Sequence, residues 1–150
     1  MLSYFNDLKD HQLIILDANF ILIPSQFGID YFEEIREIIP GKLAYIVFKS
    51  TLDELNWKKI RENKKIKYRK QLELGLQILR SHKFYEIPIE REINETMDDF
   101  LIKACLKLLN NNFKVHLATN DSRLRSRAMK LGISVIYLRQ KKKIVSDRFD

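Results

Sequence analysis

Five short apolar runs alternate with longer segments in which apolar residues recur every three or four positions. The short runs are typical of buried strands and cover residues 13–17, 43–48, 84–87, 114–118 and 133–138. The segments at 19–38, 50–81, 98–109 and 120–131 are predicted to be helices, the first interrupted near Pro24 and Gly28. Strands that alternate with helices favour right-handed crossovers and a mostly parallel sheet covered on both faces. We therefore expect a three-layer α/β/α fold with a central, mostly parallel five-stranded sheet.

Length and composition are those of one soluble domain. The 150 residues suit a single core, and the hydrophobic fraction of 45% is ordinary for a globular protein. No apolar run approaches the roughly 20 residues of a membrane span, and the N-terminus lacks a signal-peptide pattern. A lone cysteine, Cys105, excludes an intramolecular disulfide and a cysteine-rich zinc site. We expect one cytoplasmic domain over residues 1–150, with no membrane partner.

Acidic residues follow the predicted strands or open the next helix. Asp17 ends the first run, and Glu54 lies shortly after the second. Asp98 and Asp99 come after the third, and Asp121 follows the fourth. Open α/β sheets hold their ligands outside the carboxyl ends of the strands, so these acids should share one edge. Because Mg²⁺ and Mn²⁺ prefer oxygen ligands, the pattern predicts a divalent metal site there.

Basic residues give the chain a formal net charge of +7 and are clustered. The richest stretch, residues 58–70, contains eight lysines and arginines against one glutamate. Smaller groups lie at 123–130 and in a basic C-terminal tail from about residue 139. Such clusters suit a polyanion held around a metal, whereas the plainer interpretation is a solvated helix face and a charged tail.

Four motifs, taken in order, resemble those of the PIN domain, a metal-dependent nuclease fold. The resemblance covers roughly residues 12–138 and rests on Ile14-Ile15-Leu16-Asp17-Ala18-Asn19, Leu52-Asp53-Glu54-Leu55, Asp98-Asp99-Phe100-Leu101-Ile102 and Ala118-Thr119-Asn120-Asp121-Ser122-Arg123-Leu124-Arg125. The last motif, followed by Leu131-Gly132-Ile133, is similar to the archaeal and eukaryotic ribosome-processing branch. Toxins of the VapC type share the same plan.

The resemblance implies a role for each motif residue. Asp99 is preferred to Asp98 because it stands three residues before Ile102, and Asp98 is left as a helix N-cap or a further ligand. The implied catalytic and metal-binding set is Asp17, Glu54, Asp99 and Asp121, with Asn19 and Thr119 supporting it. The implied products are 5′-phosphate and 3′-hydroxyl ends, with one or two Mg²⁺ or Mn²⁺ ions bound.

Residues expected to contact RNA are basic. They are Arg123 and Arg125 near the acidic edge, and Lys64, Lys65 and Lys67 in the long basic segment. Trp57, Tyr68 and Tyr31 are either base-stacking or packing residues.

The leading hypothesis is a metal-dependent endoribonuclease, either in ribosomal RNA processing or as the toxin of a toxin–antitoxin pair. Its partners would be RNA, with a homodimer, an antitoxin or a ribosome-assembly protein left open. The alternative is a catalytically silent PIN scaffold that binds RNA or protein, although this chain keeps all four acidic positions. A phospho-acceptor receiver domain would need an aspartate after the third strand, where Ile87-Pro88 stands instead.

Overall fold

The structure is a computed structural model that describes residues 1–61 and 66–149. Lys64 and Lys65, two of the expected RNA-binding residues, lie outside the described residues. Six strands form one sheet: β1 (Gln12–Leu16), β2 (Leu43–Phe48), β3 (Tyr85–Ile87), β4 (Lys114–Ala118), β5 (Ser134–Arg139) and β6 (Lys143–Asp147). Their order is β3-β2-β1-β4-β5-β6, and only β6 runs antiparallel to its neighbour.

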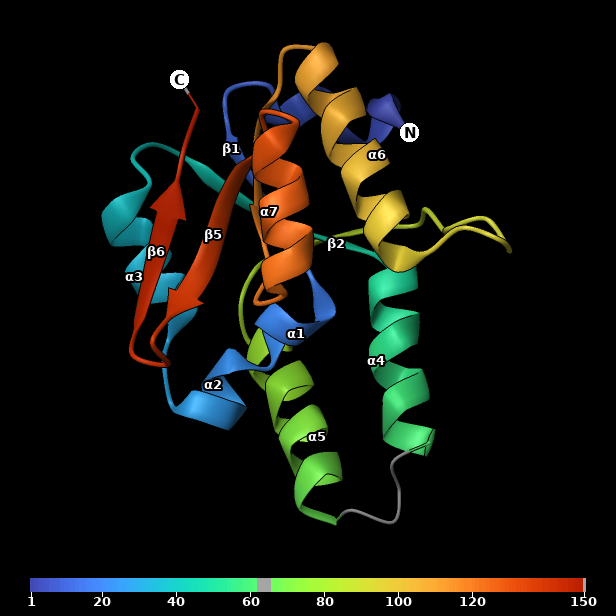
Figure 1. Ribbon diagram of the computed structural model, residues 1–150, viewed down its shortest axis with the longest axis vertical. Helices are drawn as coiled ribbons and strands as arrows, with labels where there is room; N and C mark the ends of the chain where they lie inside the picture. The colour runs from blue at the N-terminus through green and yellow to red at the C-terminus, as the bar shows by residue number, and fades with distance from the viewer. Residues whose placement is uncertain (62–65, 150) are drawn as a thin grey trace.

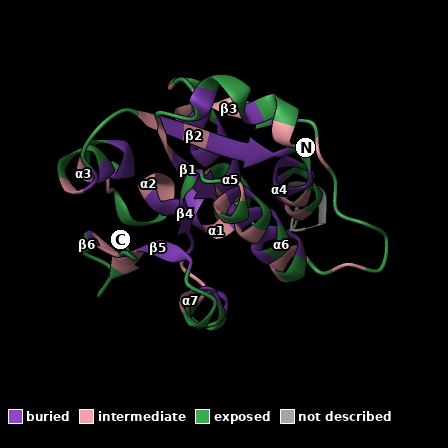
Figure 2. Ribbon diagram, turned by 90° about the horizontal axis from the view of Figure 1, so that it is seen from above, coloured by how far each residue is buried: buried purple, intermediate pink, exposed green. Residues whose placement is uncertain are grey.

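Helices cover both faces of the sheet (Figure 1). They are a 3₁₀ helix η1 (Leu2–Leu8), α1 (Ala18–Ile21), α2 (Ile23–Phe27), α3 (Tyr31–Ile38), α4 (Lys49–Arg61), α5 (Ile66–Arg80), α6 (Met97–Asn110) and α7 (Ser122–Lys130). The sheet has a hydrophobic core on each face, and the residues of a strand belong alternately to one core and the other, because successive side chains point to opposite faces. Leu13 and Ile15 pack with η1, α6 and α7, whereas Ile14 and Leu16 pack with α1 to α5. Figure 2 shows the buried strands between the two helical layers, which confirms the predicted three-layer architecture.

Two local differences from the sequence prediction affect the ends of the fold. The segment expected to be a basic tail turns at Gln140 and Lys141, both with positive φ, and returns as β6. The sheet therefore has six strands rather than five. Helix α4 begins at Lys49, directly after β2, so Asp53 and Glu54 lie in its second turn rather than its first.

The direction in which successive strands are added to the sheet reverses at its centre, between β1 and β4. The chain runs from β1 outward through β2 to β3, then crosses to β4 on the other side of β1. Such a reversal of direction is where open α/β sheets bind ligands, at the carboxyl ends of the two central strands. Asp17 directly follows β1, and Thr119 directly follows β4. In the described part of the chain, no helix is long and apolar enough to span a bilayer.

Candidate active site

Asp17 and Thr119 form the buried centre of the acidic edge. The Asp17 side chain caps α1 by accepting a 2.8 Å hydrogen bond from the Ala18 amide. Its second oxygen accepts a 2.7 Å hydrogen bond from the Thr119 hydroxyl. Asp17 is only 7% exposed and Thr119 is fully buried. The threonine therefore fixes the orientation of the carboxylate across the gap between β1 and β4.

Thr119 also connects Asp17 to the next acid. Its hydroxyl oxygen accepts a 3.1 Å hydrogen bond from the Asp121 amide. The Asp121 side chain then caps α7, accepting from the amides of Arg123 and Leu124 at 2.9 and 3.1 Å. The N-cap of α7 is thus Asp121, one residue beyond the predicted start of this helix.

Asn19 also connects the loop after β1 to the loop after β4. Its Oδ1 accepts a 2.9 Å hydrogen bond from the Asn120 amide and lies 3.4 Å from the Thr119 hydroxyl. Asn120 in turn uses its Oδ1 to accept from the Leu138 amide in β5. Side-chain hydrogen bonds therefore connect the loop after β1, the loop after β4 and strand β5, and Asn19 and Thr119 make the contacts between the two loops.

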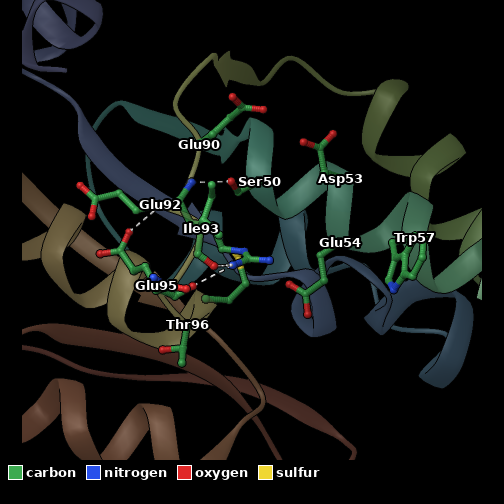
Figure 3. Close-up of a pocket in the computed structure, with 12 residues that line it drawn as sticks. Ser50, Asp53, Glu54, Trp57, Glu90, Glu92, Ile93, Glu95 and Thr96 are labelled. Atoms are coloured by element: carbon green, nitrogen blue, oxygen red, sulfur yellow. Dashed lines mark hydrogen bonds between the residues drawn. The ribbon is translucent and has the colours of Figure 1, made fainter.

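Glu54 reaches the acidic edge from α4, whereas its neighbour Asp53 turns away. The Asp53 carboxylate pairs at 2.9 Å with Lys49, which also binds Glu90 at 2.7 Å. One oxygen of Glu54 lies 3.4 Å from the Lys58 ammonium. The other oxygen, Oε2, is buried with no hydrogen-bond partner among the described residues. Figure 3 shows the two carboxylates pointing in different directions from the same helix.

Asp98 and Asp99, of which the sequence favoured Asp99, have different surroundings in the structure. Thr96 caps α6 by accepting from the Asp99 amide at 3.1 Å, so Asp98 is not the N-cap. The Asp99 carboxylate is half exposed and binds Arg127 of α7 at 2.6 Å, which lowers the pKa of Asp99. Burial and the nearby charge of Asp121 raise the pKa of Asp98, and Glu54 adds to this effect. Asp98 therefore belongs with the other acids, and Asp99 lies beside them in an ion pair.

Asp17 is the acid whose pKa is raised most, and burial is the main cause. Burial raises the pKa of its carboxyl from 3.8 to about 6, and the charges of Glu54 and Asp98 act in the same direction. The hydrogen bonds from Thr119 and Ala18 oppose this shift but do not cancel it. A buried carboxylate with acidic neighbours is costly unless a cation neutralises it.

The donor set fits a hard divalent cation. Asp17, Glu54, Asp98 and Asp121 supply only carboxylate oxygens, the ligands preferred by Mg²⁺ and Mn²⁺. Glu54 keeps one buried oxygen without a hydrogen-bond partner among the described residues, and burial raises the pKa of Asp17, so a bound cation would stabilise both carboxylates. Among the described residues, no three acidic, histidine or cysteine side chains already form a group that could hold a metal ion.

A groove of about 920 Å³ runs beside the cluster, between α4 and the segment that precedes α6. Ser50, Glu54 and Trp57 line one wall, and residues 90–97 line the other (Figure 3). Ser50 holds the two walls together by accepting a 2.7 Å hydrogen bond from the Arg91 amide. The Trp57 side chain lies 60% exposed, one helical turn beyond Glu54.

The basic and aromatic candidates fall into different environments. Arg123 and Lys67 are exposed, as phosphate contacts must be. Arg125 lies over the Tyr137 ring at 4.0 Å, while Tyr31 is fully buried in the core and is not a base-stacking residue.

Two cations pair with acids of this edge in a way that the sequence did not predict. Lys58 follows Glu54 by four residues, and Arg127 reaches Asp99 from another helix. The four-residue spacing on one helix could have identified Lys58 as a partner of Glu54. The motif after β4 places Arg127 at the acidic edge, but its pairing with Asp99 gave no signal, because the two residues lie 28 positions apart in different elements.

Comparisons with known proteins agree with this architecture. A family model described as a PIN-like domain matches residues 14–141. Among solved structures, the chain is similar to the PIN domain endonuclease Utp24, with 25% sequence identity and a TM-score of 0.66. That match covers 91% of this chain and 92% of the other. No curated protein matches the chain significantly. The family resemblance predicted from the four motifs is confirmed, and the chain belongs to the family of PIN-like domain nucleases.

Proposed function

We propose that this protein is a divalent-metal-dependent endoribonuclease. The observation that carries the proposal is the set of four carboxylates, Asp17, Glu54, Asp98 and Asp121, at the reversal point of the sheet, where burial and neighbouring charges raise the pKa of Asp17 and of Asp98. Nuclease chemistry needs such a charge arrangement, because a cation must be held beside an anionic backbone. The likeness to a PIN domain endonuclease over nearly the whole chain supports the same activity.

The four carboxylates would hold the ion or ions, and the rest of the site orients them. A bound Mg²⁺ or Mn²⁺ supplies a water of lowered pKa and neutralises charge on the reacting phosphate. Thr119 and Asn19 fix Asp17 and the loop after β4 through hydrogen bonds of 2.7 and 2.9 Å. Asp121 is held by its cap on α7. The residues of the chain therefore provide fixed negative charge, and hydrolysis needs no protein nucleophile.

Single-stranded RNA is the substrate class that the surroundings favour. The groove beside Glu54 exposes the Trp57 indole, and an aromatic face accepts an unstacked base of any sequence. Arg123 is exposed at the first turn of α7, next to the acid that caps this helix, where it suits a backbone phosphate. A paired helix would offer no free base to the indole.

A comparison of single-charge variants tests the assignment. Glu54→Gln should abolish cleavage of a single-stranded RNA in Mg²⁺ or Mn²⁺, while its binding in EDTA stays at or above the wild-type level because a negative charge is lost. Asp53→Asn is the matched control, since it removes the same charge from the adjacent residue, which pairs with Lys49 outside the cluster. Cleavage by Glu54→Gln at the wild-type rate would overturn the catalytic assignment.

Within this activity we favour the processing of ribosomal RNA. The resemblance of residues 118–125 and 131–133 to the ribosome-processing branch and the likeness to Utp24 both support this role. Sequencing of RNA crosslinked to Asp17→Asn protein in its native cells tests it, with precursor ribosomal RNA expected at the crosslinks. Crosslinks confined to other RNAs, together with a neighbouring antitoxin reading frame, would instead identify a toxin.

A further inference from the structure

A second cavity lies at the edge of the sheet opposite the acids. It has a volume of about 380 Å³, and its lining includes His11, Arg36, Tyr45, His82, Lys83 and Tyr85. These residues precede or open β1, β2 and β3, or lie on adjacent helical turns, so the cavity stands at the amino ends of these strands. β1 has five residues and is thus roughly 17 Å long, which separates this cavity from the nuclease site.

Aromatic rings form one wall of this cavity. The His82 ring lies parallel to Phe32, with 3.8 Å between centroids and 5° between planes. Tyr45 meets Phe32 edge to face at 4.7 Å. Nδ1 of His82 lies 3.0 Å from the Ile78 carbonyl oxygen and 3.2 Å from the Ser81 hydroxyl, and these contacts hold the ring in place. A carbonyl oxygen can only accept, so in the tautomer that carries its proton on Nδ1 the Ile78 contact is a hydrogen bond and Nε2 is an acceptor. The stack is therefore fixed in orientation and keeps a polar atom for a ligand.

Cations, and no acids, complete the lining among the described residues. Among the described residues, Arg36 has an ion pair with Glu33 alone, at 3.3 Å, and both side chains are more than half exposed. Such surface pairs contribute little and exchange readily for a stronger anion. The Lys83 ammonium lies 5.5 Å from the Tyr85 ring centroid. Asp10, the nearest acid to His11, is already bound to both His11 and Lys42.

We infer that this cavity is a nucleotide-binding site, with the base against the His82 wall and the phosphate at Arg36 and Lys83. A simple anion would use the cations but not the stacked rings, and an apolar ligand would use the rings but not the cations. A nucleotide combines an aromatic face with a phosphate, and about 380 Å³ lies within the usual range for small-ligand sites. The same chemistry is offered by a nucleotide within single-stranded RNA and by a free mononucleotide.

Amide chemical shifts of ¹⁵N-labelled protein in EDTA test the inference, because no cleavage occurs there. Adenosine monophosphate should shift the amides of Gly41, Leu43 and Lys83, and inorganic phosphate at the same concentration should shift them much less, because it can use the cations but not the stacked rings. The double variant Arg36→Gln, Lys83→Gln should lower the affinity for adenosine monophosphate by about tenfold or more, because hydrogen bonds to charged groups are lost. The double variant Lys107→Gln, Lys130→Gln is the matched control, since it removes two exposed cations of α6 and α7 that do not line the cavity.

A short oligoadenylate in a second titration distinguishes the two ligand sources. Shifts of the same amides identify RNA as the source, and shifts by the mononucleotide alone identify a free nucleotide. Unmoved amides, equal shifts with phosphate, or equal loss of affinity in both double variants would overturn the inference. The result is independent of the nuclease proposal, because Asp17→Asn protein should give the same titration.

Discussion

Replacing Asp17 by asparagine should stabilise the metal-free protein at neutral pH. The carboxyl is 7% exposed, and burial raises its pKa from 3.8 to about 6. The pKa of Asp17 in the folded chain is therefore about two pH units above its value in the unfolded chain. Ionisation of Asp17 consequently lowers the free energy of unfolding by about 3 kcal/mol. A neutral side chain of the same shape avoids most of this cost.

The surrounding hydrogen bonds can accommodate the amide. Its oxygen keeps the bond from the Ala18 amide, which is 2.8 Å in the wild-type protein. Its nitrogen replaces the Asp17 oxygen that now accepts from Thr119. The threonine hydroxyl would rotate to accept from this nitrogen and donate to Asn19, whose Oδ1 is 3.4 Å away. The hydrogen bond from Thr119 to Asn19 is longer than the one from Thr119 to Asp17 that it replaces. The free energy of unfolding should therefore rise by about 1–2 kcal/mol rather than by the full 3 kcal/mol.

The gain should depend on pH in one direction. Below about pH 3 Asp17 is protonated in both states, so its ionisation no longer weakens folding, and the variant should be less stable than wild type by the cost of its longer hydrogen bond. As pH rises from 3.8 to about 6, the unfolded chain loses its proton first and the wild-type protein loses stability relative to the variant, and above this range the difference should be constant. Urea unfolding in EDTA from about pH 3 to 8 measures this difference, with Asp53→Asn as the exposed control.

Added Mg²⁺ should reverse the order. A ligand that binds only the folded state stabilises it by about 2.7 kcal/mol at one hundred times its dissociation constant. The wild-type protein should therefore gain stability with Mg²⁺, and Asp17→Asn should gain little. A variant that is less stable than wild type at pH 7 in EDTA would refute the electrostatic reasoning, whatever its activity.

Three further predictions concern the rest of the site. Asp98→Asn should slow RNA cleavage on the order of 100-fold, whereas Asp99→Asn should keep most of the rate, because the second carboxylate is bound to an arginine outside the cluster; single-turnover kinetics compare the two. Thr119→Val should cost about 1–3 kcal/mol in urea unfolding and slow cleavage, since the buried oxygen of Asp17 loses its donor, and Thr119→Ser should restore both. Trp57→Ala should weaken single-stranded RNA binding by about tenfold in fluorescence anisotropy, Trp57→Phe should retain most of it, and equal binding by all three proteins would remove the indole from the RNA path.

Most of the fold was predictable because strands and helices leave local periodic signals. The apolar runs gave β1, β2, β4 and β5 within about two residues, and Pro24 with Gly28 marked the breaks between α1, α2 and α3. Gly28 caps α2 in the left-handed region, at φ 67°, which its lack of a side chain allows. β6 left no such signal. Its five residues contain one buried side chain, Ile144, and edge strands rich in charge are hard to distinguish from a tail.

The acids were predictable as a group, because each of them follows a strand of one parallel sheet. Their individual roles depend on contacts between elements that are distant in the sequence. The sequence favoured Asp99 because it stands three residues before Ile102, and this spacing carries no information about the neighbouring helix. Adjacent helix positions differ by about 100° in direction, so only one of Asp98 and Asp99 can face the sheet edge. Arg127, from α7, occupies the side that Asp99 faces and neutralises it. Burial and the charges of Asp121 and Glu54 raise the pKa of Asp98 despite the opposing effect of Arg127, so a bound cation would stabilise its ionised form.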